Sequence, residues 1–439
     1  MKIKVIEKTY DEVMALPKMK HKKPHRPDIF FRTLMRLVSI PDLRKTSFSY
    51  EKLGMEKLAK KEPALYLANH SSFIDLEIVA TMLYPRPFNI VTTTDGFIGK
   101  NWLMRRIGCI PTKKFVNDLS LVHDIDYALH KNKSSVVLFP EAGYSFDGTA
   151  SPLPESLGKC IKLLKVPVVM IKTYGAYHRD PLYNNLQRRR VKVSAEEEFL
   201  FSREEIEALS CEEINARINA AFSFDSFAWQ KENRIKIDEP FRADCLNRLL
   251  YKCPHCLTEG KMHGEGTEIK CCSCGKTYVL DEYGYLKAKD GETKFDHIPD
   301  WYNWQRECVK REIDDNEYET SVPVDICMTV DTKHLYHVGE GNILHTGEGF
   351  KLTGCDGKLD YSQKPLANYT LNSDFNWYEI GDVVSIGNSK ALFYCFPKNG
   401  KDIVAKMRLA AEELFKKISE EIRSKRECRI KDQCNKKCD

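Results

Sequence analysis

The segment ALYLANHSSFID, residues 64–75, decides the fold of the region around it. Its first five residues are apolar, as in a strand that is buried on both faces, and an amphipathic run follows the segment. This pattern predicts a strand that ends just before His70 and a helix capped by Ser71 or Ser72. Asp75 then lies about one turn inside the helix, where its carboxylate can reach back to the imidazole of His70.

A histidine held by a carboxylate is a typical general base. The acid fixes the tautomer of the ring and stabilises the imidazolium that forms when the other ring nitrogen takes a proton. His70 and Asp75 are therefore the candidate catalytic pair. With 12 histidines and 63 acidic residues in the chain, this spacing also arises by chance, so a second motif is needed to support it.

Short apolar runs recur along the first half of the chain and alternate with amphipathic stretches. They lie at residues 64–68, 89–92, 136–139 and 166–171. This rhythm predicts an α/β domain over residues 51–240, with a mixed sheet flanked by helices and functional groups at the strand ends. The charged stretch from Glu196 to Asn219 has apolar residues at helical spacing and is expected to be the closing helix of that domain.

A second motif, FPEAGYS at residues 139–145, also follows a buried apolar run. Pro140 stops the strand ladder, and Glu141 is projected into the loop that follows. A simple turn after a strand is the alternative interpretation of this motif on its own.

Together, the blocks NHSSFID and FPEAGYS resemble the NHxSxxD-like and FPEGTRS-like blocks of the phospholipid and glycerol acyltransferase family. The resemblance extends over Phe30 to Glu198. It implies direct acyl transfer from acyl-CoA or an acyl carrier protein to a lipid acceptor, such as 1-acylglycerol-3-phosphate or a related lysophospholipid. It also implies that His70 and Asp75 are catalytic. The acceptor-binding residues that it implies are Glu141, Gly143 and Ser145.

Two departures from the family pattern concern the acceptor. Lys113 or Lys114 stands near the position of an arginine that contacts the acceptor phosphate in the family, and lysine supplies charge but no bidentate fork. Tyr144 replaces the arginine of the second block. An acyltransferase with an acceptor that lacks a phosphate is therefore an alternative. A lipid-binding scaffold with a vestigial catalytic domain is another.

Two CxxC motifs lie in residues 241–286, where the composition changes to Cys, Gly and Lys. Such a pair gathers four thiolates around zinc in a closed, structural site, so a zinc ribbon is expected. The expected ligands are Cys253, Cys256, Cys271 and Cys274. Cys272 leaves the register open, and His255 or His263 can take the place of a ligand.

The remaining parts have less specific signals. We expect an N-terminal basic segment with an amphipathic helix (residues 1–50), a linker with a helix (287–321) and a β-rich domain with a C-terminal helix (322–425). A basic tail with cysteines (426–439) follows. The β-rich domain loosely resembles a pleckstrin-homology type barrel, a fold that often binds lipid headgroups or proteins. A protein partner is expected to dock through this domain or through the zinc ribbon.

The composition favours a cytoplasmic protein that meets a membrane at its surface. No run approaches the roughly 20 apolar residues of a spanning helix, the start has no secretory pattern, and 16 cysteines without such a signal indicate a reducing compartment. The net charge of +5 is small for this length, and no basic and aromatic stripe accompanies the zinc ribbon, so no nucleic acid is expected. A helix capped by Asp28 and stopped by Pro41, with Arg32 and Arg36 on its edge, either lies in the lipid interface or packs on its own domain.

Overall fold

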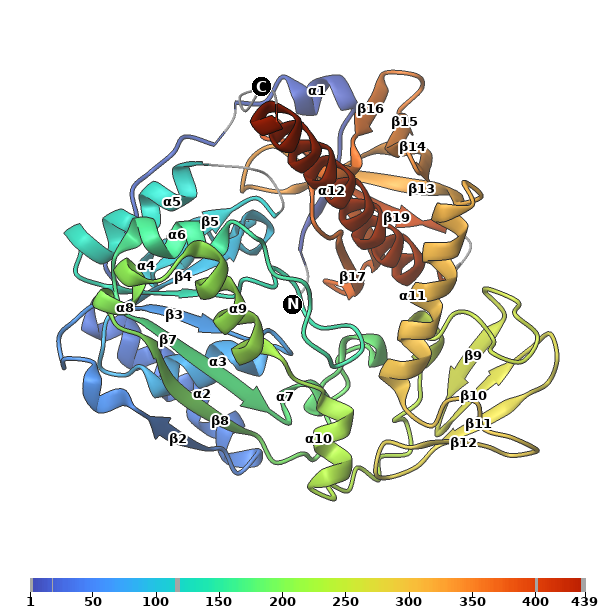
Figure 1. The fold of residues 1–439 in the computed structure, drawn as a ribbon, viewed down its shortest axis with the longest axis horizontal. Coiled ribbons are helices and arrows are strands. Elements are labelled where there is room, and N and C mark those ends of the chain that lie inside the picture. The colour runs from blue at the N-terminus through green and yellow to red at the C-terminus, as the bar shows by residue number, and fades with distance from the viewer. Residues whose placement is uncertain (1–2, 18, 115–118, 399–401, 436–439) are drawn as a thin grey trace.

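The computed structural model describes residues 3–17, 19–114, 119–398 and 402–435. Figure 1 shows an α/β unit in blue and green, a small β module in yellow, and a β-rich unit with a long helix in orange and red. The expected mixed sheet with helices and the β-rich C-terminal region with a helix are confirmed. Within the described ranges, no helix combines the length and the apolarity needed to cross a bilayer. The domain limits stay a prediction.

The α/β unit is built on a seven-stranded sheet in the order β2-β8-β7-β3-β6-β4-β5. Its strands are β2 (Ser49–Leu53), β3 (Leu65–Ala68), β4 (Phe88–Thr93), β5 (Cys109–Thr112), β6 (Ser135–Leu138), β7 (Val168–Tyr174) and β8 (Ser194–Phe201). The five strands from β7 to β5 are parallel, whereas β8 is antiparallel to β7. The segments that follow β3, β4, β5 and β6 therefore meet at one edge of the sheet, where sites form in open α/β folds.

Helices cover both faces of this sheet because its strands are apolar on both sides. Tyr66 and Ala68 belong to one core cluster, and Leu65 and Leu67 to the other. The first face is covered by α2 (Ile29–Lys45) and α3 (Ile74–Met82). The second face is covered by α5 (Leu119–Asp126), α6 (Leu157–Leu164), α8 (Arg203–Ala208) and α9 (Cys211–Phe222).

The expectation of one helix from Glu196 to Asn219 is wrong. Its first part is β8, whose glutamates find partners in the sheet: Glu196 accepts a hydrogen bond from the hydroxyl of Tyr174 at 2.7 Å, and Glu197 lies 3.6 Å from the ammonium of Lys52. Pairing with β7 thus overrides the helical spacing. The rest forms α8 and α9, each opened by a serine with a capping box.

Helix α2 begins as expected but ends later. The side chain of Asp28 accepts a hydrogen bond from the backbone N–H of Phe31 at 3.1 Å, which confirms the N-cap. The helix then continues through Pro41, which was expected to stop it. Packing offsets a proline cost of about 3 kcal/mol, because Leu43 is buried in the core and Asp42 pairs with Arg179.

The small β module has four antiparallel strands in the order β12-β11-β10-β9. These are β9 (Met262–Glu265), β10 (Glu268–Cys271), β11 (Thr277–Leu280) and β12 (Leu286–Ala288). Helix α11 (Ile298–Asp314) follows and packs on the module, with the indole N–H of Trp301 donating to the carbonyl of Lys252 at 2.9 Å. The helix expected within residues 287–321 is confirmed.

The C-terminal unit is a sheet in the order β16-β15-β14-β13-β19-β18-β17, with β1 (Val5–Glu7) parallel to β14. Its strands are β13 (Glu319–Thr329), β14 (Leu335–Thr346), β15 (Gly349–Gly354), β16 (Leu359–Gln363), β17 (Asn372–Trp377), β18 (Gly381–Gly387) and β19 (Leu392–Pro397). Helix α12 (Val404–Asn435) closes the unit and extends into the segment expected to be a tail. The likeness to a pleckstrin-homology barrel stays a prediction.

Candidate active site

His70 and Asp75 meet at the end of β3. The Nδ1 atom of His70 lies 3.0 Å from Oδ2 of Asp75, which is almost fully buried. An ionised carboxylate only accepts hydrogen bonds, so Nδ1 carries the proton and the lone pair of Nε2 is left for a substrate. The side chain of His70 is 23% exposed, so the ring remains within reach of solvent.

The expected serine cap of α3 is wrong. The N-cap is Phe73, without a side-chain cap, and α3 begins at Ile74. Instead, the carboxylate of Asp75 accepts hydrogen bonds from the backbone N–H groups of Ser71 and Ser72 at 2.7 and 3.0 Å. Asp75 therefore lies in the first turn, where the positive end of the helix favours a carboxylate. The turn is held by the acid that orients His70.

Glu141 joins the two motifs. Its carboxylate accepts the backbone N–H of His70 at 3.0 Å and the backbone N–H of Ser151 at 2.8 Å. The segment from residue 139 to residue 151, here called the Glu141 loop, is thereby tied to the turn after β3. Burial raises the pKa of Glu141 to about 7, while the hydrogen bonds from Ser151 and His70 and the charge of Arg408 oppose that shift.

Two aromatic rings of the second motif pack against the imidazole of His70. The ring centroids of Phe139 and Tyr144 each lie 4.3 Å from that of His70, with Phe139 stacked and Tyr144 tilted. Tyr144 thus places a neutral aromatic ring beside the imidazole, and burial raises the pKa of its phenol well above the ordinary value. The two rings limit rotation of the base.

The other two candidates in the Glu141 loop differ in their surroundings. Ser145 is fully engaged, since its N–H donates to the carbonyl of His70 at 3.0 Å and its hydroxyl donates to the carbonyl of Thr149 at 2.6 Å. Gly143 has open space where a Cβ would be, and its N–H donates to no residue that the structure describes. Gly143 thus presents a free donor, whereas Ser145 supports the loop.

Lys113 and Lys114 follow β5 at the same edge of the sheet but face the C-terminal unit. The ammonium of Lys113 donates to the carbonyl of Ser389. Lys114 faces Asp374 of β17, whose pKa burial raises to about 7 against the opposing charge of Lys114. The Oδ1 atom of Asp374 is buried and accepts no hydrogen bond from any described residue.

The C-terminal unit also contacts the Glu141 loop directly. The hydroxyl of Tyr369 donates to the carbonyl of Pro140 at 3.1 Å, and Phe375 lies 4.5 Å from Phe146 between ring centroids. Arg408 of α12 reaches the carbonyl of Tyr144 at 3.5 Å and the hydroxyl of Ser151 at 3.2 Å. These contacts could not be predicted from the sequence, because they join residues more than 200 positions apart and leave no spacing signal.

The cysteine cluster forms as the CxxC motifs predict. The Sγ atoms of Cys253, Cys256, Cys271 and Cys274 all lie within 4.8 Å of one another, which favours Cys271 over Cys272 as the cluster member. Two of the distances between Sγ atoms are 3.8 Å (Cys253 to Cys274) and 3.6 Å (Cys256 to Cys271). Zinc–sulfur bonds of about 2.3 Å in a tetrahedron place sulfurs roughly 3.8 Å apart, so the four thiols fit a tetrahedral metal.

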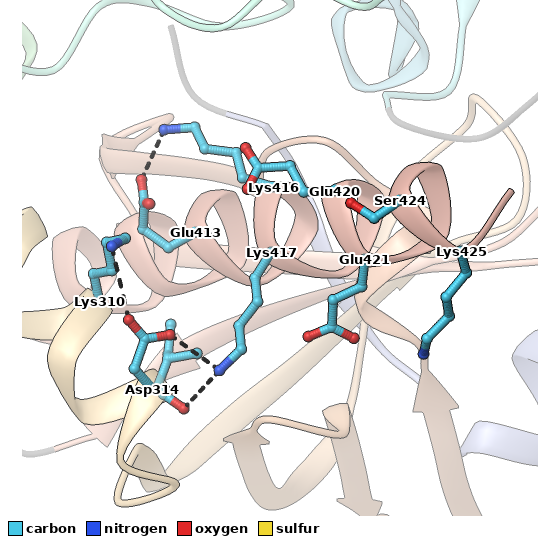
Figure 2. Close-up of a pocket in the computed structure, with 10 residues that line it drawn as sticks. Lys310, Asp314, Glu413, Lys416, Lys417, Glu420, Glu421, Ser424 and Lys425 are labelled. Atoms are coloured by element: carbon cyan, nitrogen blue, oxygen red, sulfur yellow. Dashed lines mark hydrogen bonds and ion pairs between the residues drawn. The ribbon is translucent and has the colours of Figure 1, made fainter. Parts of the chain in front are cut away.

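A cavity of about 650 Å³ lies between α11 and α12 and contains none of the motif residues. Figure 2 shows its charged lining, in which Lys417 pairs with Asp314 at 3.0 Å and Lys416 with Glu413 at 2.8 Å. These pairs join the two helices or brace α12, so the cavity is an interhelical groove rather than the active site.

The comparisons with known proteins address the same region. The Acyltransferase family model matches residues 49–172. A chloroplastic 1-acyl-sn-glycerol-3-phosphate acyltransferase of Brassica napus is 27% identical over 151 residues, which cover 33% of this chain and 42% of that protein. The chain thus spans less than half the length of this relative. The 1-acyl-sn-glycerophosphate (LPA) acyltransferase PlsC from Thermotoga maritima matches 42% of this chain and 80% of its own at 18% identity and a TM-score of 0.33.

The backbone of the Glu141 loop leads to a prediction about stability. Ala142 has a φ of 56°, a left-handed conformation that costs a residue with a Cβ about 1 kcal/mol or more. Ala142→Gly should therefore raise the free energy of unfolding by up to about 1 kcal/mol in denaturant melts. Gly143→Ala is the matched control, because Gly143 has room for a Cβ and should change stability by less than about 0.5 kcal/mol. A lower free energy of unfolding in Ala142→Gly would show that the backbone at Ala142 is not strained.

Proposed function

We propose that the chain transfers a fatty acyl group from an acyl thioester to the hydroxyl of a glycerolipid acceptor, on the premise that residues 49–172 match the Acyltransferase family model. Acyl-CoA or an acylated carrier protein is the donor. The observation that carries the proposal is the hydrogen-bonded set in which Asp75 holds Nδ1 of His70 and Glu141 holds its backbone N–H.

In the proposed mechanism, Nε2 of His70 takes the proton from the acceptor hydroxyl as its oxygen attacks the thioester carbonyl. Asp75 stabilises the imidazolium, and the N–H of Gly143 is the candidate donor to the oxyanion. Collapse of the intermediate breaks the carbon–sulfur bond, and the imidazolium returns the proton to the leaving thiolate. The products are the acylated lipid and the free thiol, with no enzyme nucleophile.

Two acceptors remain, and each has support. The Brassica napus relative acts, by its name, on 1-acyl-sn-glycerol-3-phosphate, and Lys113 and Lys114 offer charge for a phosphate. An acceptor without phosphate is favoured by Tyr144, which removes a cation beside His70, and by Asp374, which faces Lys114. A phosphomonoester would meet that carboxylate, whereas a hydroxyl-bearing head would donate to it.

The acceptor lipid is proposed to arrive at an apolar surface beside this site. Phe30, Leu37 and Val38 of α2 and Trp102 of α4 (Asn101–Arg106) are 58 to 67% exposed. Phe31 links the two helices, with its ring 6.1 Å from that of Trp102. The same two helices carry four arginines, and apolar and basic side chains together are typical of helices in a lipid interface. The arginines are Arg32, Arg36, Arg105 and Arg106.

We also propose that the cysteine cluster binds zinc as a structural site. The four thiols supply a closed set of soft ligands, which leaves no open position for catalysis. The metal would stabilise a module whose own core is small.

The first experiment tests catalysis. His70→Ala should abolish transfer of labelled acyl groups without lowering the melting temperature, because it removes the base but little buried surface. Asp75→Asn should lower kcat by about 10⁴-fold if it acts through the tautomer of His70. The assay offers acyl-CoA with matched lysophospholipids and monoacylglycerols. Wild-type rates in His70→Ala would reject this mechanism, and no transfer by the wild type would favour a vestigial scaffold.

The second experiment tests the metal. Freshly purified reduced protein should contain one zinc, and Cys271→Ser should lose it. A chelator should then unfold the module over residues 241–288, measured by hydrogen exchange, before the α/β unit changes. Cys272→Ser is the matched control, because Cys272 lies outside the cluster and should keep the metal. Absence of metal from the wild type would contradict the proposal.

The third experiment tests the membrane surface. The double change Phe30→Ser and Trp102→Ser should weaken vesicle binding by about 3 kcal/mol if both rings enter the lipid, with little change in melting temperature. Leu163→Ser is the matched control, since Leu163 is 66% exposed on α6, which covers the opposite face of the sheet. Flotation with anionic vesicles measures the difference. Equal flotation of all three proteins would reject this surface.

A further inference from the structure

The Glu141 loop contains buried acids but no basic residue. Residues 134–158 include no lysine or arginine, whereas Glu141 and Asp147 are both buried. A buried carboxylate is costly unless charges or hydrogen bonds compensate it. The compensating cations of this loop must therefore come from elsewhere in the chain.

Arg408 of α12 is one such cation. The residue is 5% exposed, and its guanidinium lies over the ring of Phe146, 4.2 Å from the centroid. One terminal nitrogen donates to the hydroxyl of Ser151 at 3.2 Å, and the other approaches the carbonyl of Tyr144 at 3.5 Å. Arg408 therefore contacts the Glu141 loop on both sides of its tip.

A second layer of contacts fixes the guanidinium. Glu412, one turn along α12, accepts from Nε of Arg408 at 3.2 Å and from the hydroxyl of Thr370 at 2.6 Å. Arg306 of α11 forms an ion pair with the same carboxylate at 2.7 Å. Because Glu412 is held from three elements, the orientation of Arg408 is set before any substrate binds.

We propose that Arg408 is a positioning residue of the active site, supplied by the C-terminal helix, which holds the Glu141 loop in the form that fixes His70. The path is short: Arg408 contacts Ser151, the N–H of Ser151 donates to Glu141, and Glu141 accepts the N–H of His70. This role rests on the proposed acyl transfer. It makes the C-terminal unit part of the catalytic site instead of an appended domain.

The charge of Arg408 acts in the same direction as its hydrogen bonds. It lowers the pKa of Glu141 against the dominant effect of burial, and so favours the ionised carboxylate that accepts both N–H groups. The other groups that face Glu141 are His70 from the turn after β3 and Tyr369 from the segment before β17. Removal of Arg408 should thus raise the pKa of Glu141 and deprive the loop of its acceptor at a higher pH.

The test uses the whole 439-residue chain with Arg408→Met and Arg408→Lys. Arg408→Met should lower kcat/KM at pH 7 by about tenfold or more, as expected for loss of a charged hydrogen bond, and Arg408→Lys should restore part of it. The matched control is Arg423→Met, which removes an exposed pair between α12 and Glu155 and should change kcat/KM less than about twofold.

A pH profile separates positioning from simple support of the fold. In Arg408→Met the acidic limb of kcat/KM should move to higher pH, because Glu141 protonates more easily. In a Glu141→Gln background, Arg408→Met should move the acidic limb of kcat/KM no further. The losses of kcat/KM caused by the two substitutions should then not add. Additive losses with an unmoved limb would overturn the proposal.

Hydrogen exchange gives a readout that does not need activity. Exchange of the amides in residues 140–152 should accelerate in Arg408→Met, while the module over residues 241–288 stays protected. Unchanged exchange in that loop would overturn the inference, and so would failure of both Arg408 variants to fold, since the role would then be global. Absence of acyl transfer by the wild type would reject the proposed function. Hydrogen exchange in residues 140–152 would still show whether Arg408 positions the Glu141 loop.

Discussion

The site depends on one buried carboxylate that accepts hydrogen bonds from two separate segments. Glu141 binds the backbone N–H of His70 on one side and that of Ser151 on the other. Because β3 and β6 are adjacent and parallel, the segments after them emerge side by side, and a single side chain can bridge them. Without this bridge, the turn that carries His70 and the Glu141 loop would have to be ordered separately. Fixing each backbone costs about 1 kcal/mol or more of conformational entropy per residue.

The same carboxylate explains why the α/β unit is not independent of the rest of the chain. A group whose pKa is raised by burial favours its neutral form, and the ionised form needs help from outside the loop. That help comes from α12, and α12 is held in turn by Arg306 of α11. Phe146 and Phe375 belong to one continuous core cluster that also contains residues of the small module.

Much of the site was predictable because its geometry is local. His70 and Asp75 are five residues apart across a turn, and the strand ends that carry His70 and Glu141 follow from buried apolar runs. The cysteines were predictable for the same reason, since each CxxC pair makes its own turn. The role of Asp75 was not, because its carboxylate accepts N–H groups of Ser71 and Ser72 in the turn before the helix, where a serine was expected to accept N–H groups of the helix itself.

The features that sequence reasoning missed are those decided by tertiary partners. The glutamates of β8 are tolerated in a sheet because Tyr174 and Lys52 bind their carboxylates. Helix α2 continues through Pro41 because Asp42 forms an ion pair with Arg179. Arg408 is the extreme case, since its importance depends on a loop more than 250 residues away in the chain. Periodicity reports which face of an element is apolar, but it carries no information about which distant charge that face will meet.

The order of the units along the chain suggests what the small module contributes. Its residues Leu249 and Lys252 are bonded to Gln305 of α11 on both the carbonyl and the N–H side. The next residue of α11, Arg306, is the one that pairs with Glu412. By fixing Gln305, the module also fixes the position of Arg306 next to α12. Arg306 in turn holds the carboxylate of Glu412, which orients Arg408. In this arrangement a series of contacts links the small module to the Glu141 loop through Gln305 and Arg306 of α11 and Glu412 and Arg408 of α12.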